Sequence, residues 1–207
     1  MNVARLLFPV QVLGPGKRLG IWFAGCPRRC LGCSNPELWV KKTEWEIPVT
    51  ALLHLVEPFF VSQPQMGLIL TGGEPFAQGM ELLIFLQEME RYTDDILVYT
   101  GYTLEDLHSG PQLWQECLKH IGVLIDGPYQ QEQNIDVPLR GSANQKIHYL
   151  KPVLRKAYER FMREKGNQIQ DFTTGDGVVS VGIHHPWFKD DLTTRMEKQG
   201  VILCEPK

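Results

Sequence analysis

The chain has 207 residues, of which 43% are hydrophobic and 22% are charged, and its formal net charge is −3. This composition predicts a folded globular protein with enough chain to bury a core, organised around one main domain. The charge gives no reason to expect nucleic acid or anionic membrane as a partner. No apolar run approaches the roughly 20 residues that span a bilayer, and the N-terminus lacks the features of a signal peptide. We therefore expect a cytoplasmic protein.

The first expected element is a buried strand over residues 19–24, which ends at three closely spaced cysteines, Cys26, Cys30 and Cys33. The odd total of five cysteines and their uneven spacing do not suit a secreted disulfide framework. In a reducing compartment, such a triplet indicates metal binding or redox chemistry. A [4Fe–4S] cluster normally takes four thiolates, so three would leave one iron open to a substrate or cofactor.

Other interpretations of the triplet stay open on the residues alone. A structural zinc site could use Cys30 and Cys33 with two further ligands, although no second cysteine pair or paired histidines follow. Cys117 or Cys204 could supply a fourth ligand to zinc or to a closed electron-transfer cluster. For these two cysteines we expect instead a structural role, as small apolar residues in a helix and in a terminal strand.

Further along the chain, short apolar strands alternate with helical segments. Strands are expected over residues 68–70, 96–99 and 123–125, and the clearest helix covers residues 80–92. This alternation predicts an α/β fold with a mainly parallel sheet and right-handed crossovers. About four βα units are too few for a closed eight-stranded barrel, so we expect a partial, open (β/α) barrel. Its chemistry should lie at the carboxyl ends of the strands.

A glycine-rich segment follows the strand over residues 68–70 and contains Gly72, Gly73 and Glu74. Glycines at a strand end allow a ligand to approach the backbone closely. The carboxylate of Glu74 offers an acceptor for a protonated amine. An ordinary turn after a strand is the alternative interpretation.

Three further polar residues are candidates at later positions. Asp126 follows the strand over residues 123–125, where it could position a ribose or a cation, or simply cap a turn. Arg140 and Asn144 could bind the carboxylate of a cofactor or the backbone of a partner, because guanidinium groups suit carboxylates. A structural role is equally open for each of them.

The spacing Cys-x3-Cys-x2-Cys resembles the signature of the radical S-adenosylmethionine superfamily, and Gly72-Gly73-Glu74 resembles its second motif. The resemblance implies that Cys26, Cys30 and Cys33 hold a [4Fe–4S] cluster whose open iron chelates the amino and carboxylate groups of S-adenosylmethionine. An electron from the reduced cluster would then break the sulfonium bond and yield a 5′-deoxyadenosyl radical. The glycines and the acid of the second motif would contact the methionyl amino group.

More motifs narrow the resemblance to the glycyl-radical enzyme activases, and among them to the activating proteins of anaerobic ribonucleotide reductases. They cover about residues 8–149: Gly14-Pro15-Gly16-Lys17-Arg18, Asn35, Trp39, Thr100-Gly101-Tyr102, Val123-Leu124-Ile125-Asp126-Gly127 and Arg140-Gly141-Ser142-Ala143-Asn144-Gln145. The resemblance implies a protein substrate that receives a glycyl radical, and a reductant of the flavodoxin or ferredoxin type. It adds Thr100, Asp126, Arg140 and Asn144 to the residues expected at the S-adenosylmethionine site.

Residues 151–207 have no counterpart in that family. They are expected to form a basic helix over residues 151–165, a strand over 178–183, a helix over 188–198 and a last short strand over 201–204. We therefore divide the chain into a core, residues 1–149, and an α+β extension, residues 150–207, packed on the core beside the open barrel. The extension would be a flap over the barrel or a partner-recognition element. Within it, His184 and His185 are candidates for a metal or docking site, and an ordinary turn is the alternative interpretation.

Two alternative functions are compatible with these features. The first is a radical enzyme that acts directly on a small molecule or a peptide, with the extension closing the site. A non-enzymatic alternative is an adaptor module that binds an iron–sulfur cluster or zinc.

Overall fold

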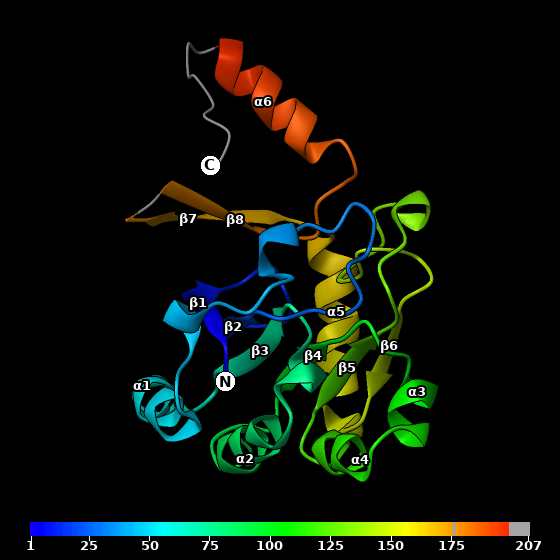
Figure 1. The fold of residues 1–207 in the computed structure, drawn as a ribbon. Helices are drawn as coiled ribbons and strands as arrows, with labels where there is room; N and C mark the ends of the chain where they lie inside the picture. The colour runs from blue at the N-terminus through cyan, green and yellow to red at the C-terminus, as the bar shows by residue number, and fades with distance from the viewer. Residues whose placement is uncertain (176, 199–207) are drawn as a thin grey trace.

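The computed structural model describes residues 1–175 and 177–198 of the chain. Its centre is a six-stranded sheet with helices against it, joined by a two-stranded hairpin and a final helix (Figure 1). The strands are β1 (Val3–Val10), β2 (Arg18–Phe23), β3 (Gly67–Gly72), β4 (Ile96–Tyr99), β5 (Val123–Asp126), β6 (Lys146–Tyr149), β7 (Ile169–Thr174) and β8 (Gly177–Gly182). The α-helices are α1 (Val49–Ser62), α2 (Met80–Met89), α3 (Leu104–Ser109), α4 (Gln112–Leu118), α5 (Arg155–Lys165) and α6 (Phe188–Lys198). Short 3-10 helices are η1 (Pro36–Leu38), η2 (Thr43–Trp45), η3 (Pro75–Gln78), η4 (Gln131–Gln133) and η5 (Pro152–Leu154).

The main sheet has the strand order β1-β2-β3-β4-β5-β6, and its four central strands are parallel. The four strands expected from apolar runs are confirmed as β2 to β5, and they are buried on both faces, as parallel strands usually are. The fold is therefore mixed α/β with a mainly parallel sheet that does not close into a barrel.

Two antiparallel edge strands, β1 and β6, were not expected from the sequence. Strand β1 is only half buried and contains Pro9, which is tolerated at a sheet edge. Strand β6, with the sequence Lys-Ile-His-Tyr, is short and mostly polar. Strand β6 therefore lacks the continuous apolar run by which a central strand is recognised, and the apolar run of β1 is interrupted by Pro9.

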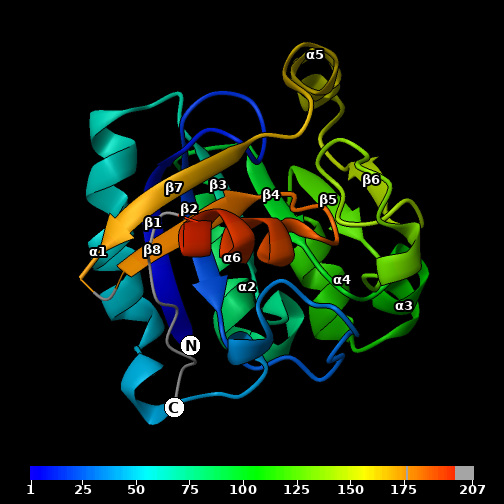
Figure 2. The same ribbon diagram turned by 90° about the horizontal axis from the view of Figure 1, so that it is seen from above.

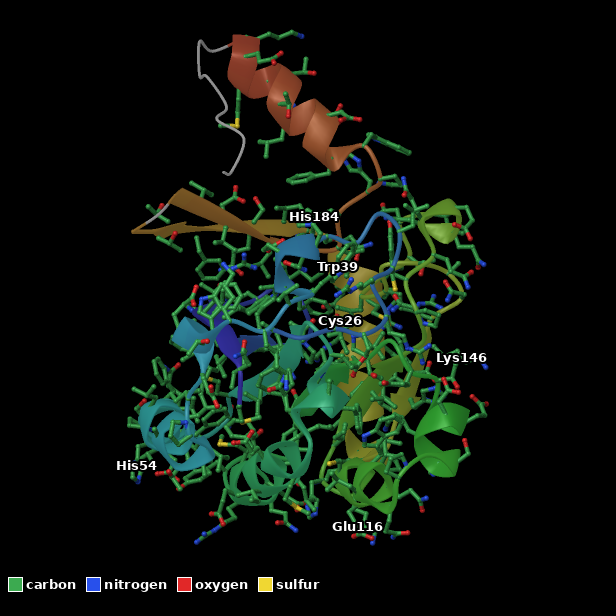
Figure 3. The ribbon with its side chains drawn as sticks, in the orientation of Figure 1. Cys26, Trp39, His54, Glu116, Lys146 and His184 are labelled. Atoms are coloured by element: carbon green, nitrogen blue, oxygen red, sulfur yellow. The ribbon has the colours of Figure 1, made fainter. Side chains whose placement is uncertain are left out.

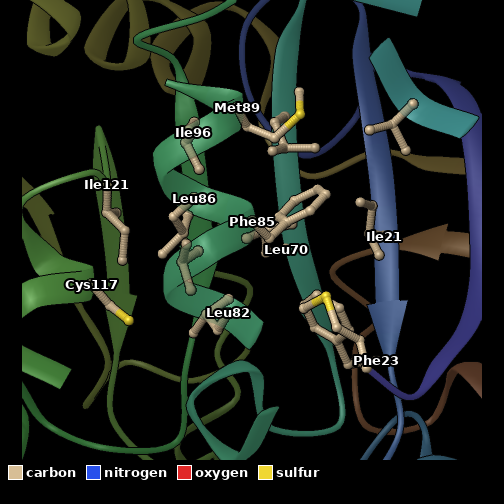
Figure 4. Packing of buried hydrophobic residues seen from close by; sticks show 14 of the residues in the cluster. Ile21, Phe23, Leu70, Leu82, Phe85, Leu86, Met89, Ile96, Cys117 and Ile121 are labelled. Atoms are coloured by element: carbon tan, nitrogen blue, oxygen red, sulfur yellow. The ribbon is translucent and has the colours of Figure 1, made fainter. Parts of the chain in front are cut away.

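One face of the sheet packs against helices α1, α2 and α4 around a large hydrophobic cluster (Figure 4). Helix α2 confirms the predicted helix over residues 80–92, although it ends at Met89. Its apolar residues recur at helical spacing and therefore form one buried stripe against the strands. The stripe consists of Leu82, Phe85, Leu86 and Met89. Cys117 on α4 lies in the same cluster, 1% exposed, as expected for a structural residue.

The other face of the sheet is covered by the extension. Strands contribute Ile69, Leu97 and Val123 to a second hydrophobic cluster, and α5 and β8 supply buried residues to it. Those residues are Tyr158, Phe161 and Val181. Seen from above, β7 and β8 run across the sheet (Figure 2). The segment after Tyr149 therefore completes the hydrophobic core on this side.

Most of the elements expected in the extension are present. The predicted basic helix starts as η5, continues as α5 and stops before Gly166, whose φ is 59°. The expected strand corresponds to β8, and α6 has the predicted bounds. Strand β7 was not predicted, because its sequence is largely polar and exposed. The strand expected over residues 201–204, together with Cys204, lies outside the described residues.

Within residues 1–175 and 177–198, no helix combines the length and the apolar character needed to cross a membrane.

Candidate active site

The carboxyl ends of β2, β3, β4 and β5 meet at one edge of the sheet, because these neighbouring strands are parallel. The loops that follow them surround a cavity of about 220 Å³, which we call the chamber. Seven of the residues expected at the site line the chamber: Cys26, Cys30, Cys33, Gly72, Gly73, Glu74 and Thr100. The sequence motifs that follow separate strands are thus brought together in space.

The cysteine-containing segment forms a closed loop after β2. The N–H groups of Gly25 and Cys26 donate to the carbonyl oxygens of Leu38 and Trp39, both at 2.9 Å. Gly25 has a φ of 91°, in the left-handed region that favours glycine. Cys26 lies at the end of the sheet, beneath Trp39 and His184 in the view of Figure 3. The hydrogen bonds to the segment after the loop therefore fix the place where the cysteines begin.

The thiols have surroundings suited to iron–sulfur ligation. Cys26, Cys30 and Cys33 are half-buried and form no disulfide. The N–H of Asn35 points at Sγ of Cys33, 3.4 Å away. Burial raises the pKa of the Cys26 thiol, and backbone N–H groups of Arg29 and Arg28 act in the opposite direction. Thiols beside a cavity with backbone donors aimed at sulfur fit a cluster held by thiolates.

Among residues 1–175 and 177–198, no group of three or more His, Cys, Asp or Glu side chains is arranged so that it could hold a metal ion.

Gly72 and Gly73 allow the end of β3 to pass directly against the end of β2. A Cβ atom at Gly72 would lie 2.6 Å from the carbonyl oxygen of Phe23, and one at Gly73 would lie 2.9 Å from that of Gly25. The N–H groups of Gly73 and Glu74 donate to these same two oxygens, at 2.8 and 3.0 Å. Glycine is therefore required here because two segments of this chain approach each other closely. The hydrogen bonds between them fix the glycine-rich segment against the cysteine loop.

Glu74 is 1% exposed and joins the ends of β3 and β4. Its Oε1 accepts hydrogen bonds from Thr100 Oγ1 at 2.8 Å and from the N–H of Phe76 at 3.1 Å, and its Oε2 accepts one from the N–H of Gly101 at 2.8 Å. Burial raises the pKa of Glu74 to about 7, although these hydrogen bonds act in the opposite direction. The carboxyl group is therefore held rigidly at the chamber wall.

Arg28 was not singled out from the sequence, although it also lines the chamber. Its guanidinium lies 4.2 Å from the ring centroid of Tyr102 and 3.2 Å from Oδ2 of Asp106. This cation–π contact and ion pair connect the cysteine loop to the start of α3. No sequence pattern marks Arg28 within the cysteine motif, so the sequence does not indicate that this residue lines the chamber.

Asp126, Arg140 and Asn144 are not among the described residues that line the chamber. The carboxylate of Asp126 accepts the N–H of Leu104 at 2.7 Å and that of Lys146 at 3.2 Å. Arg140 donates to the carbonyl oxygen of Gln145 at 3.0 Å. Asn144 donates to the carbonyl oxygen of Pro128 at 2.8 Å. Their present contacts hold the loops behind the chamber wall.

Gln145, at the end of the segment that contains Arg140 and Asn144, does line the chamber. Its side chain accepts the N–H of Gly141 at 2.8 Å and donates to the carbonyl oxygen of Gly127 at 2.9 Å. Gln145 therefore joins the loop after β5 to the loop before β6. The motif from Arg140 to Gln145 therefore identified the correct segment, but it did not single out Gln145.

The extension supplies one wall of the chamber. Six consecutive residues of β8 and the following turn line it: Val179, Ser180, Val181, Gly182, Ile183 and His184. The hairpin is fastened to the core by Gln170, whose side chain contacts the carbonyl oxygen of Pro9 at 2.8 Å and the N–H of Gln11 at 2.9 Å. His184 was a candidate from the sequence as a metal or docking residue, and a flap over the barrel was expected of the extension, whereas no pattern in the sequence indicated Ser180.

Comparisons with known proteins identify a family model and several relatives that this chain resembles. A family model described as a 4Fe-4S single cluster domain matches residues 12–148. The chain is 34% identical over 154 residues to the anaerobic ribonucleoside-triphosphate reductase-activating protein of Vibrio cholerae serotype O1, covering 68% of this chain and 94% of that protein. The proteins of the same name from Enterobacteria phage T4 and Haemophilus influenzae are 34% and 33% identical over 151 residues, covering 71% and 70% of this chain and 93% and 96% of theirs.

Proposed function

Since the chain belongs to the family of anaerobic ribonucleoside-triphosphate reductase-activating proteins, we propose that it is a radical S-adenosylmethionine enzyme that installs a glycyl radical on such a reductase. The observation that carries the proposal is the meeting of Cys26, Cys30 and Cys33 with Gly72, Gly73 and Glu74 around one chamber. The open, mainly parallel sheet then corresponds to a partial (β/α) barrel of the radical S-adenosylmethionine type.

The three cysteine thiolates would hold a [4Fe–4S] cluster and leave one iron without a protein ligand. When bound and reduced, the cluster supplies the electron that splits S-adenosylmethionine into methionine and a 5′-deoxyadenosyl radical, which takes a hydrogen atom from the substrate. We propose a flavodoxin- or ferredoxin-type protein as the source of that electron. The N–H of Asn35 would stabilise the negative charge on Cys33 sulfur.

Glu74 and Thr100 would form the wall against which the methionyl end of S-adenosylmethionine binds, beside the backbone of Gly72 and Gly73. The carboxylate of Glu74 is held by its contacts with Thr100 and Gly101, so it presents a fixed acceptor to an ammonium group. For Asp126, Arg140 and Asn144 we propose a positioning role, because their side chains hold the loops behind this wall.

The two parts of the chain would have different roles. Residues 1–149 would form the activase core, and residues 150–207 the extension that packs on it. Because β8 lines the chamber, the extension would shield the reacting groups from water and limit what enters.

The test is anaerobic reconstitution of the full-length protein with iron and sulfide, followed by reduction in the presence of S-adenosylmethionine. We expect formation of 5′-deoxyadenosine, stimulated by an anaerobic ribonucleoside-triphosphate reductase from the same source, and a glycyl radical signal from that reductase in electron paramagnetic resonance spectra. Cleavage without a radical on the reductase would favour a small-molecule or peptide substrate. A bound cluster without cleavage would favour an adaptor module.

A further inference from the structure

A groove leads from the chamber to the surface between β8, α6 and the cysteine loop. It has a volume of about 380 Å³ and shares Cys33, Ser34, Val179, Ser180 and other residues with the chamber. One side of it is formed by Gly32, Cys33 and Asn35 of the cysteine loop, and the opposite side by Phe188 and Leu192 of α6. We call it the β8 groove. It lies next to the chamber, and Cys33 lines both.

The groove runs along the edge of β8. Val178, Val179 and Ser180 all line it, although successive side chains of a strand point to opposite faces of the sheet. A groove on one face of the sheet would be lined by every second residue of the strand. A groove lined by three consecutive residues therefore follows the edge of the strand. The hairpin sheet has two strands, so β8 pairs on one side with β7 alone. Within the described residues, no backbone hydrogen bond joins the other edge of β8 to a third segment.

The groove is lined by apolar side chains of β8 and α6 and by polar side chains elsewhere, among them Arg5, Glu37 and Gln131. Val178 is 68% exposed and Leu192 is 41% exposed, both large apolar side chains that remain in contact with solvent. A strand edge whose N–H and C=O groups have no backbone partner among residues 1–175 and 177–198, next to apolar side chains, is an arrangement that can bind an extended peptide by strand addition. The backbone pairing provides affinity, and the flanking apolar positions select the side chains of the peptide.

Any polypeptide whose residue reaches the chamber must also accommodate the chain on either side of that residue. An extended segment placed in the β8 groove would enter the chamber beside Cys33 and Ser180, which border both cavities. The family match ends at residue 148, so this edge belongs to a part of the chain that the family model does not cover.

We propose that the edge of β8 opposite β7 pairs with an extended segment of the polypeptide that this enzyme activates, and so guides that segment past Cys33 into the chamber. This inference rests on the proposed function. It assigns to the extension a peptide-binding site formed by β8 together with Val178, Phe188 and Leu192.

The probe is a set of overlapping synthetic peptides that covers the anaerobic reductase from the same source, and binding to the reconstituted full-length protein is measured by fluorescence anisotropy. The peptide that binds is then resynthesised with one backbone N-methyl group at each position in turn. A paired strand directs alternate N–H groups to its partner. We therefore expect methylation at every second residue to weaken binding about tenfold, and methylation between them to have little effect.

Val178→Asp and Leu192→Asp should each weaken binding of the same peptide by tenfold or more, because a carboxylate would replace an apolar wall. The matched control is Val61→Asp, on the exposed surface of α1, where the valine is 72% exposed. Iron content verifies that each variant is folded. Failure of every peptide to bind, N-methyl effects without alternation, or equal binding by Leu192→Asp and Val61→Asp would each overturn the inference.

These outcomes are separate from those of the proposed function, because peptide binding is measured without turnover. Alternating N-methyl effects in a protein that forms no 5′-deoxyadenosine would support the strand-edge site and reject the radical chemistry. Reductase-stimulated cleavage with no alternation would reject the strand-edge site alone.

Discussion

The hydroxyl of Tyr158 donates a hydrogen bond of 2.6 Å to Oδ1 of Asp95. Tyr158 belongs to helix α5 of the extension, whereas Asp95 precedes β4 in the core. The same carboxylate pairs with the fully buried guanidinium of Arg18, at 2.7 and 2.8 Å. The extension thus supplies a hydrogen bond to the partly buried carboxylate that pairs with Arg18 at the start of the parallel strands. This is the end of the sheet remote from the cysteines.

Replacing Tyr158 by Phe should lower the free energy of unfolding by about 1–3 kcal/mol, because a hydrogen bond to a partly buried carboxylate is lost while the ring is kept. Tyr149→Phe is the matched control, since Tyr149 packs edge-on against Tyr158 at 6.2 Å and its ring is retained in Phe. The control should change stability by less than about 0.5 kcal/mol. Equal effects in urea unfolding would show that the Asp95 hydrogen bond contributes little.

This network illustrates a limit of sequence reasoning. Arg18 was recognisable only as part of a motif, because its partner Asp95 lies far along the chain and Tyr158 lies in a different part of the fold. A lone arginine before a strand normally indicates a solvated charge. Only the three-dimensional packing shows that Arg18 is buried, and therefore that it needs both partners.

The central strands and the site edge were predictable for a clear physical reason. Runs such as Leu68-Ile69-Leu70 are buried on both faces, and the polar residues that follow parallel strands must meet at one edge. The hydrogen-bond partners of a site residue were not predictable from the sequence. Glu74 was expected to face a ligand, but its contacts with Thr100 and Gly101 depend on a strand pairing that the sequence does not specify.

Replacing any of Cys26, Cys30 or Cys33 by Ala should abolish iron binding after anaerobic reconstitution, whereas the unchanged protein should hold about four irons per chain. Cys117→Ala is the control, because Cys117 on α4 is buried in the hydrophobic core. It should keep the iron and cost only the stability of a small cavity. Iron analysis and the absorption spectrum measure the difference. A loaded cluster in the variant lacking all three loop cysteines would disprove the assignment.

Glu74→Ala should weaken S-adenosylmethionine binding at least tenfold while iron content stays unchanged. The variant loses the acceptor of three hydrogen bonds, so it should also unfold more easily, by about 1–3 kcal/mol for each buried donor left without a partner. Perturbation of the reduced cluster's paramagnetic spectrum by S-adenosylmethionine reports the binding.

Thr100→Val separates these two effects. It removes one of the three hydrogen bonds but leaves the carboxylate in place, so most of the affinity should remain. Affinity in Glu74→Ala equal to that of the parent would show that Glu74 has only a structural role.

The ion pairs of Glu90 should make stability depend on pH. Its carboxylate contacts the imidazole of His120 and the ammonium of Lys151, and hydrogen bonds from these two groups lower the pKa of Glu90. A carboxyl group whose pKa is lowered on folding stabilises the fold above its unfolded value of about 4.5 and loses this contribution as the pH falls through the folded value. Glu90→Gln should therefore destabilise the protein at pH 7 by about 0.5–1 kcal/mol, since the pair is partly exposed.

At low pH the difference between Glu90→Gln and the parent should disappear, as measured by urea unfolding. Glu88→Gln is the control. Glu88 pairs with Arg91 on the surface at 2.9 Å, with 41% and 71% of the two side chains exposed, so its loss should have little effect at either pH. An unchanged difference for Glu90→Gln at both pH values would contradict the role of its charge.

Two truncations should separate the stabilising role of the extension from its role at the chamber. A chain that ends at Tyr149 loses Tyr158 and Phe161, which are 0% and 8% exposed, and each such side chain contributes about 1.5–3 kcal/mol of burial. We expect it to keep the iron and to cleave S-adenosylmethionine slowly, but with exposed apolar surface, lower solubility and a lower melting temperature.

A chain that ends at Asn167 keeps α5 and also keeps the hydrogen bond from the N–H of Leu139 to Asn167 Oδ1. It lacks the chamber wall supplied by Val179 to His184. It should therefore be more stable than the chain that ends at Tyr149, although less stable than the full chain because buried Val181 is lost. It should also lose most of the stimulation of 5′-deoxyadenosine formation by the reductase. Comparing cleavage with and without the reductase for all three chains measures this. If the chain ending at Asn167 were stimulated as strongly as the full-length protein, β8 and α6 would have no part in coupling cleavage to the substrate. If the chain ending at Tyr149 lost its iron, the extension would be required for the fold that holds the cysteines, and the division at residue 149 would be wrong.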